Sequence, residues 1–365
     1  MKPAKSSLII TAATIGSGVF ALPYVIAQAG WLLALAYYVI LGAMVTAAHA
    51  AYLATLAQEK EKQRLLGLMR RYFGRTGFWF GFAGIVVGLL LSFVIFLILG
   101  TQFIQILAPS IHRYAALAIM WLLIAIPALA SNRRATALEM ISVISVGAVM
   151  IFLGASSLAA PVGRATSIPA VNWHAFFLPF GIVLFTLAGW TGVEPFYESQ
   201  KGKMLSWRGI ATGTAIAIAL YGIFAAGILR TVPHVTPSIL SDLSSWPIWK
   251  KDILAVIGLF ALTTVAMPIS HELRNALEKD LRWPISASRI AIIGVPLAVV
   301  LMGVTNFVSV IGVAGSIFIS MQYLSIIAVA RRALALPAIQ RLLLDIASIA
   351  FLAAAVYEVA LFVIQ

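Results

Sequence analysis

The chain has 365 residues, of which 62% are hydrophobic and 10% charged, and it contains no cysteine. Ordinary soluble domains are roughly 45–50% apolar and about 25% charged, so this composition excludes a soluble globular protein. The absence of cysteine from the sequence excludes disulfides and thiolate-based metal or redox sites.

Apolar runs recur along the whole chain, and a length of about 20 residues is typical of transmembrane helices rather than barrel strands. We expect eleven spans, which are separated by charged clusters, prolines and glycines. They cover residues 7–28, 31–57, 80–107, 114–131, 136–159, 174–198, 208–230, 252–273, 287–305, 307–330 and 339–362. The first run is interrupted by glycines and lacks a small-residue cleavage site, so we do not interpret it as a signal peptide. The sequence therefore predicts an all-α integral membrane protein.

The formal net charge of +13 follows from the expected topology. When alternate loops are assigned to alternate sides of the membrane, the side opposite the N-terminus receives Arg113, Arg164, Arg230, Lys250 and Lys251, and all other Lys and Arg residues fall on the N-terminal side. Because Lys and Arg accumulate in cytoplasmic loops, we predict a multi-pass plasma membrane protein with a cytoplasmic N-terminus and an extracytoplasmic C-terminus. The same bias explains the charge without a nucleic-acid partner.

The first and sixth spans are interrupted by glycines near their middle. Gly16-Ser17-Gly18 is followed by Pro23, and Gly189-Trp190-Thr191-Gly192 is followed by Pro195. Glycine lets the backbone leave helical dihedrals, and proline is best tolerated in the first turn of a helix that restarts. Both spans are therefore predicted to be discontinuous helices. The alternative is that these glycines only allow helices to pack closely.

The positions of the two breaks predict an inverted repeat. A unit of five spans separates them, and because five is odd, the second copy of such a unit is inverted in the membrane. We expect a first repeat over residues 1–165, a second over residues 166–335, and an eleventh helix over residues 336–365. Transporters of this 5+5 architecture bind their substrate at the paired breaks.

A broken helix exposes backbone groups that bind a zwitterion. The N–H groups of Gly16, Ser17 and Gly18 are candidate donors to a carboxylate, and carbonyls near Thr186 and Leu187 are candidate acceptors from an ammonium group. Since no Lys or Arg lies near the middle of any span, a carboxylate ligand must rely on backbone donors of this kind.

Four segments resemble the amino acid/polyamine/organocation superfamily, and especially its amino acid/auxin permease and aromatic amino acid permease branches. They are TIGSGVFALP at residues 14–23 with AGW at 29–31, FTLAGWTGVEPFYE at 185–198, MPISHELRNALEKD at 267–280 and GVAGS at 312–316. The resemblance implies a leucine-transporter-type fold that works by alternating access, and a transporter rather than an enzyme.

The resemblance also implies roles for individual residues. Gly16, Ser17 and Gly18 would bind the substrate carboxylate, and Trp190, beside Gly189, would close over the substrate as an aromatic gate. Ser92, Phe93, Phe96 and Ser316 are candidates for the side-chain pocket, with ordinary helix packing as the alternative.

Carboxylates inside a membrane are costly and therefore suggest gating or coupling. Glu194 either contacts the ligand or complements a helix dipole. Glu198 helps form an inner gate, by resemblance, or lies at a solvated helix end. His271 and Glu272 are candidate proton carriers, or interfacial side chains. A sodium site in this fold would instead use carbonyls at Ala12 and Ile15 with hydroxyls of Thr263 and Thr264, although such threonines usually bond their own helix.

We therefore expect a secondary active transporter that imports a neutral L-amino acid, aromatic or branched, across the lipid bilayer. We favour a co-transported proton over sodium and expect no other cofactor. One alternative is an organic-cation or amine carrier of the same fold. A small-solute channel is less favoured because no repeated ring or filter sequence appears. An enzyme is also less favoured, because the sequence shows no paired nucleophile and base.

Overall fold

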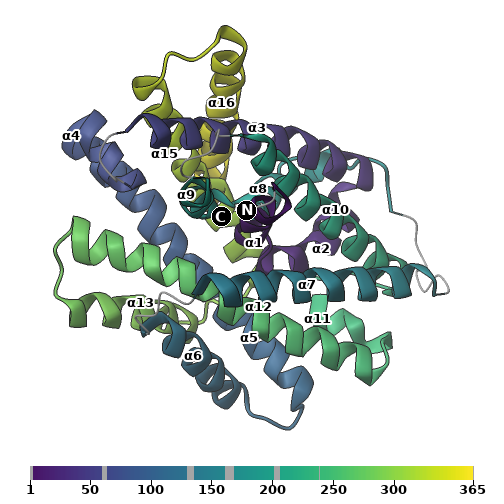
Figure 1. Cartoon of the computed structure of the whole chain (residues 1–365). Coiled ribbons are helices and arrows are strands. Elements are labelled where there is room, and N and C mark those ends of the chain that lie inside the picture. The colour runs from purple at the N-terminus through teal and green to yellow at the C-terminus, as the bar shows by residue number, and fades with distance from the viewer. Residues whose placement is uncertain are drawn as a thin grey trace.

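The computed structural model of the chain describes residues 3–59, 64–129, 135–160, 168–200, 206–237 and 239–364, and its regular elements within these ranges are all helical. Figure 1 shows α1 (Pro3–Thr14) and α9 (Val193–Ser199) near the middle of the view, with other helices around them. The remaining elements of the first half are η1 (Ser17–Ala21), α2 (Leu22–Ala29), α3 (Trp31–Gln58), α4 (Leu65–Phe82), η2 (Ala83–Val87), α5 (Gly88–Leu107), α6 (Arg113–Leu129) and α7 (Ala135–Leu158).

The second half begins with η3 (Trp173–Ala175), α8 (Leu178–Leu187) and η4 (Trp190–Gly192), which lead into α9. The elements that follow are α10 (Arg208–Thr231), α11 (Ile239–Asp242), η5 (Leu243–Ser245), α12 (Ile248–Arg274), η6 (Asn275–Asp280), α13 (Ile285–Leu301), α14 (Phe307–Val313), η7 (Ala314–Ile319), α15 (Ser320–Ala333) and α16 (Ala338–Ile364).

Six helical segments of the described residues are long and apolar enough to cross a membrane. They are Trp31–Gln58, Leu65–Leu107, Arg208–Thr231, Ile248–Asp280, Phe307–Ala333 and Ala338–Leu361. If the bent pair Ser7–Thr14 and Ser17–Ala29 counts as one span, the described residues contain up to seven such spans. Three shorter apolar helices are Arg113–Ile126, Ile144–Leu158 and Ile285–Leu301. An all-helical membrane architecture is thus confirmed, whereas the count of eleven spans and the inverted repeat with its boundaries stay predictions.

Large apolar side chains are exposed on the peripheral helices. Ile126 on α6, Ile290 on α13 and Ile349 on α16 each expose more than two thirds of their surface, at 68%, 67% and 69%. Exposed apolar side chains of this kind are unfavourable in water and favourable against lipid chains, because contact with lipid removes apolar surface from water. The helices also satisfy their own backbone hydrogen bonds, as a bilayer requires.

The broken helices occupy the interior of the bundle. Helix α1 packs against α10 and η4, and α8 packs against α2, α3 and η7. The turn from α2 to α3 depends on Gly30, whose φ of +96° favours glycine and whose missing side chain leaves room for the backbone of Ala170. The amides of Trp31 and Leu32 donate to the carbonyls of Pro169 and Ala170, at 3.2 and 3.0 Å, which ties the approach to α8 to the start of α3.

Candidate functional site

The chain leaves helical geometry at both positions where the glycine motifs predict it. Helix α1 ends at Thr14, Gly16 is extended with φ −145° and ψ −162°, and the axis turns by 52° before the chain continues into η1 and α2. Helix α8 ends at Leu187, and Ala188 and Gly189 interrupt it before η4 and α9. The ends of two half-helices, whose terminal N–H and C=O groups lack partners within the helix, therefore meet near the centre of the protein.

Tyr221 on α10 joins the ends of the two half-helices. Its hydroxyl lies 2.6 Å from the carbonyl oxygen of Thr14 and 3.1 Å from that of Thr186. The hydroxyl has one proton, so it donates to one of these carbonyls at a time. Tyr221 is 1% exposed, and its position cannot be inferred from the sequence because α10 is distant from both breaks along the chain.

A cavity of about 110 Å³ lies beside the two breaks. It is bounded by the end of α1, by η4 and the start of α9, and by faces of α5, α12 and α15. Of the residues that the sequence proposes for the substrate or sodium site, the cavity is lined by Ala12, Ile15, Gly16, Ser17, Ser92, Phe96, Trp190 and Thr264.

The other proposed substrate and sodium residues lie behind this lining. Gly18 packs against α8 so closely that an added Cβ would lie 2.5 Å from Cγ2 of Thr186. Gly189 packs in the same way against the hydroxyl of Thr14. Thr186 and Leu187 are buried in α8, where the Thr186 hydroxyl donates to the carbonyl of Val183 at 2.7 Å.

Ser316 and Thr263 also point elsewhere. The hydroxyl of Ser316 lies against Gly181 on α8, and Ser316 is not part of the cavity lining. Thr263 donates to the carbonyls of Leu259 and Phe260 in its own helix, at 3.0 Å each.

A buried hydroxyl in the lining of the cavity lacks a partner. Ser17 is 1% exposed, and its Oγ makes no hydrogen bond with any described residue. The hydroxyls of Ser92 and Thr264, by contrast, donate to carbonyls of their own helices, at 3.1 Å for Ser92 to Gly88 and 2.9 Å for Thr264 to Phe260. Burying a hydroxyl without a hydrogen-bond partner costs free energy, so a ligand in the cavity that bonds the Ser17 hydroxyl would recover that cost.

Trp190 is held in place by a side chain that the sequence reasoning missed. Its indole N–H donates to Oε1 of Gln322 at 2.6 Å, and Nε2 of Gln322 donates to the carbonyl of Gly84 at 2.9 Å. Gly84 belongs to η2, a π-helical turn inside the long segment Leu65–Leu107, and such turns are frequent at functional sites. Gln322 lines the cavity and is fully buried, so the aromatic side chain and its anchor bound the same space.

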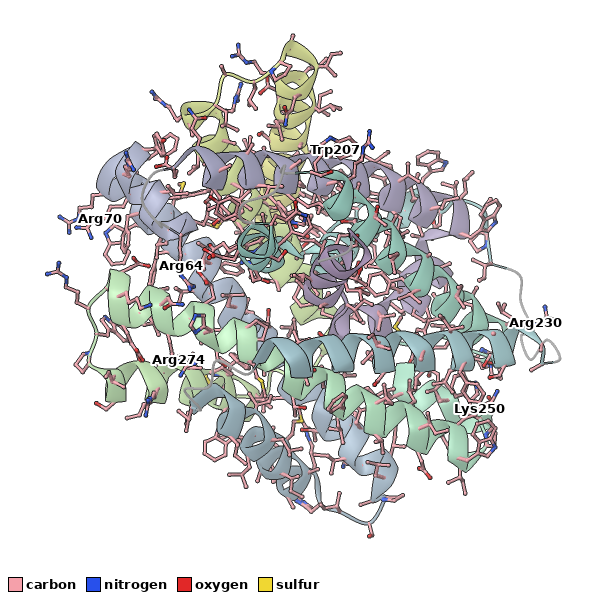
Figure 2. The ribbon with its side chains drawn as sticks, in the orientation of Figure 1. Arg64, Arg70, Trp207, Arg230, Lys250 and Arg274 are labelled. Carbon is pink, nitrogen blue, oxygen red and sulfur yellow. The ribbon has the colours of Figure 1, made fainter. Side chains whose placement is uncertain are left out.

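Three of the proposed gating and coupling residues, Glu194, His271 and Glu272, form a charged cluster with Arg64 outside the cavity lining. Arg64, at the start of α4, bonds Glu272 and places its second terminal nitrogen 3.2 Å from Nε2 of His271. Its Nε lies 4.0 Å from Glu194 on α9, and the Tyr52 hydroxyl donates to Glu194 at 2.8 Å. Figure 2 shows Arg64 between α4 and α12.

The cluster thus connects the helix after the second break with α3, α4 and α12. Glu198 lies about one turn further along α9. Nothing in the sequence pattern singles out Arg64 or Tyr52, because Arg64 is one of many basic residues near the N-terminal side. No group of three or more His, Cys, Asp or Glu side chains suited to a metal ion occurs within the described residues.

Comparisons with known proteins agree with this architecture. The profile of the family described as "Transmembrane amino acid transporter protein" matches residues 2–365. No curated protein matches the chain.

Among solved structures, MhsT in complex with L-phenylalanine has a TM-score of 0.67 at 15% identity, over 97% of this chain and 98% of that one. A manganese transporter of Eremococcus coleocola, with an aromatic bis-isothiourea compound, has a TM-score of 0.66 at 14% identity, over 99% and 87% of the two chains. The nucleobase-cation-symport-1 family transporter Mhp1 has a TM-score of 0.58 at 14% identity, over 98% and 91%. At these identities the likeness shows a shared fold.

Proposed function

Since the chain belongs to the transmembrane amino acid transporter family, we propose that it is a secondary transporter that imports neutral amino acids with aromatic or branched apolar side chains. It is a transporter of leucine-transporter-type fold that works by alternating access, and its substrate lies in the cavity beside the two helix breaks.

The lining of the cavity carries this proposal. Its residues, all within the described part of the chain, include no Asp, Glu, Lys, Arg or His side chain. Most of the lining is apolar, including Phe96, Val146 and Ile319, and the Ser17 hydroxyl is unpartnered. A ligand with a net charge would be left without a counter-ion there, whereas a zwitterion brings its own and can use helix dipoles.

The two ends of the zwitterion fit the two kinds of half-helix end. The first turn of the helix that restarts at Ser17 offers N–H groups and a positive dipole end to the carboxylate. The carbonyl ends of α1 and α8 offer a negative dipole end to the ammonium group. This arrangement disfavours an organic cation without a carboxylate, for which the donors at Gly16 and Ser17 would have no acceptor.

The cavity extends from the breaks toward the face of the membrane on which α1 begins. Ile9, Thr191, Pro195 and Ile269 continue its lining in that direction. On the opposite side Phe20, which is 8% exposed, packs edge-on against Phe103 and Phe224, with ring centroids 5.1 and 5.8 Å apart. The geometry corresponds to a state that is closed beyond Phe20 and accessible from the N-terminal face.

For the coupling ion we favour the proton. The cluster of Arg64, Glu194, His271 and Glu272 contains titratable groups at the junction of α9 with α12, where alternating access would change their surroundings. Sodium bound by carbonyls of Ala12 and Ile15 with the hydroxyl of Thr264 is the alternative, because these three residues line the cavity together.

Binding to the purified protein tests the substrate class. We expect L-phenylalanine and L-leucine to raise the melting temperature, and phenethylamine and N-acetyl-L-phenylalanine, which each lack one charged end, to leave it unchanged. Equal stabilisation by phenethylamine would reject the carboxylate site and favour the amine carrier.

Uptake into proteoliposomes tests the transport mode and the ion. A carrier shows saturable counterflow of labelled substrate, whereas a channel shows dissipative flux without counterflow. Accumulation driven by a pH gradient in sodium-free buffer supports proton coupling, and accumulation that requires a sodium gradient at equal pH rejects it.

A further inference from the structure

A buried histidine connects α3 to the second helix break. His49 is fully buried, and its Nε2 lies 3.0 Å from the hydroxyl of Tyr323 on α15. The Tyr323 hydroxyl in turn donates to the carbonyl of Leu187 at 3.4 Å, and Leu187 is the last residue of α8. The same carbonyl accepts from the amide of Gly189 at 2.8 Å, so this chain of bonds ends on the backbone of the break itself.

The bonds of Tyr323 constrain where the proton of the imidazole lies. When the single proton of Tyr323 goes to Leu187, Nε2 of His49 donates to the tyrosine oxygen. Nδ1 then carries the bare lone pair, and it has no partner among the described residues. In this tautomer of the neutral ring, Nδ1 is a vacant, buried position for a second proton.

Protonation selects between two arrangements of these groups. With protons on both ring nitrogens, Tyr323 can donate only to Leu187, so the bond to the break is enforced. With a neutral ring, the other tautomer becomes available, in which Tyr323 donates to Nε2 and releases the Leu187 carbonyl. Protonation of His49 therefore excludes the arrangement in which α15 is released from the end of α8.

The surroundings of His49 isolate it from other charges. Glu194 on α9 reaches α3 at Tyr52, about one turn away from His49, where its carboxylate accepts a hydrogen bond from the tyrosine hydroxyl. Arg331 on α15 pairs with Asp345 on α16 at 2.6 Å. The other charged or titratable side chains on elements packed against α3 are Tyr24 on α2, Tyr197 and Glu198 on α9, Arg208, Tyr221 and Arg230 on α10, Arg332 on α15, and Arg341, Tyr357 and Glu358 on α16, while α8 carries none.

We propose that His49 is a proton-binding positioning residue that links proton transfer to the geometry of the second break through Tyr323. The proposal rests on the transporter function proposed above and adds a coupling site to it. The proton comes from the aqueous phase, occupies Nδ1 and returns to water, and no other bond is made or broken. Since the ring is sealed in this conformation, the proton can enter and leave only when α8 and α15 rearrange, which makes its movement conditional on the transport cycle.

The test compares exchange with accumulation in His49→Gln. Glutamine retains a side-chain amide that can donate to Tyr323 but binds no proton near neutral pH. We expect counterflow of labelled L-phenylalanine to persist, because exchange needs no net proton movement, and accumulation driven by a pH gradient to fall to the equilibrium level. Tyr323→Phe, which removes the link to Leu187, is expected to show the same separation.

The control is His174→Gln, the same substitution at an exposed position on η3, and it is expected to accumulate substrate like the wild type. Proton uptake measured with a pH-sensitive dye during substrate transport adds a readout that loss of packing alone does not change. There, His49→Gln is expected to carry about one proton fewer per substrate than the wild type, as linkage requires.

Three results distinguish the ways in which the proposal can fail. Accumulation by His49→Gln at the wild-type level, with unchanged proton uptake, overturns the coupling role. Wild-type protein that accumulates substrate only with sodium overturns it as well, and leaves the carrier function standing. Wild-type protein without counterflow rejects the carrier function itself. If His49→Gln does not fold, Tyr323→Phe decides by the same readouts.

Discussion

Gly16 and Gly18 belong to one sequence motif but lie in different surroundings. An added Cβ at Gly16 meets no atom within 4 Å, whereas one at Gly18 would lie 2.5 Å from the Thr186 side chain and 3.3 Å from its Cα. The φ of −145° at Gly16 is extended backbone that alanine adopts without strain. Gly16 thus faces open space at the cavity, and Gly18 is required for close contact between η1 and α8.

This difference predicts opposite effects of the same substitution. Gly16→Ala is expected to keep the melting temperature and weaken binding of L-phenylalanine, because the new methyl group occupies the cavity beside the backbone donors. Gly18→Ala is expected to destabilise the protein by about 1–3 kcal/mol, as overpacking does. Thermal unfolding and ligand titration of both variants check this, and the roles assigned here are wrong if Gly18→Ala is as stable as the wild type.

The two cavity serines give a second matched pair. Ser17→Ala removes the unpartnered hydroxyl, and if that hydroxyl bonds the charged carboxylate, the binding free energy should weaken by about 1.5–3 kcal/mol, or roughly 10- to 150-fold in affinity. Ser92→Ala removes a hydroxyl already bonded to Gly88, so a smaller loss is expected. Equal affinities of wild type and Ser17→Ala, measured by titration calorimetry, would exclude Ser17 as a ligand.

At the scale of elements, the sequence predicted the breaks but not the groups that hold them. Glycine and proline act locally on the backbone, so their spacing indicates where a helix stops and restarts. Tyr221, Gln322 and Arg64 act across the fold, and each lies far in sequence from the residue that it bonds. Their helices present many similar side chains, and only packing decides which of them reaches a break.

Arg64 provides the next prediction, because it joins α4 to both α9 and α12. Arg64→Gln leaves Glu194 and Glu272 without their cationic partner, and we expect a lower melting temperature together with a larger change in kcat for uptake than in KM. The reason is that Arg64 lies outside the cavity lining and contacts α9 and α12, which the proposed alternating access would move.

Arg75→Gln is the matched control, since Arg75 is exposed on the same helix. It is expected to leave uptake kinetics unchanged. An Arg64→Gln protein whose kinetics and stability equal those of Arg75→Gln would show that the cluster does not control opening of the N-terminal face.

At the scale of the molecule, hydropathy and charge predicted the membrane-embedded helical architecture that the structure confirms. They did not predict that helical structure begins before the third expected span, residues 80–107. The segment Leu65–Leu107 is helical on both sides of a kink at Gly74, where φ is +64°. The basic residues Arg70, Arg71 and Arg75 in its first part are typical of a loop, but helix formation there is favoured by packing of the apolar Leu66, Leu68 and Met69, which are buried.

Orientation in the membrane is the last prediction, and the absence of cysteine makes it directly testable. Ser110, between α5 and α6, and His234, between α10 and α11, are exposed in loops assigned to the extracytoplasmic side, and Ala335, between α15 and α16, is exposed in a loop assigned to the cytoplasm. We expect a membrane-impermeant maleimide to label Ser110→Cys and His234→Cys in intact cells, and Ala335→Cys only after the membrane is permeabilised. Because the basic residues gather on the side of Ala335, the opposite labelling pattern would mean that charge bias does not orient this protein. It would also place the cavity's accessible face outside the cell, so that the conformation described here would be the one that takes up substrate rather than the one that releases it.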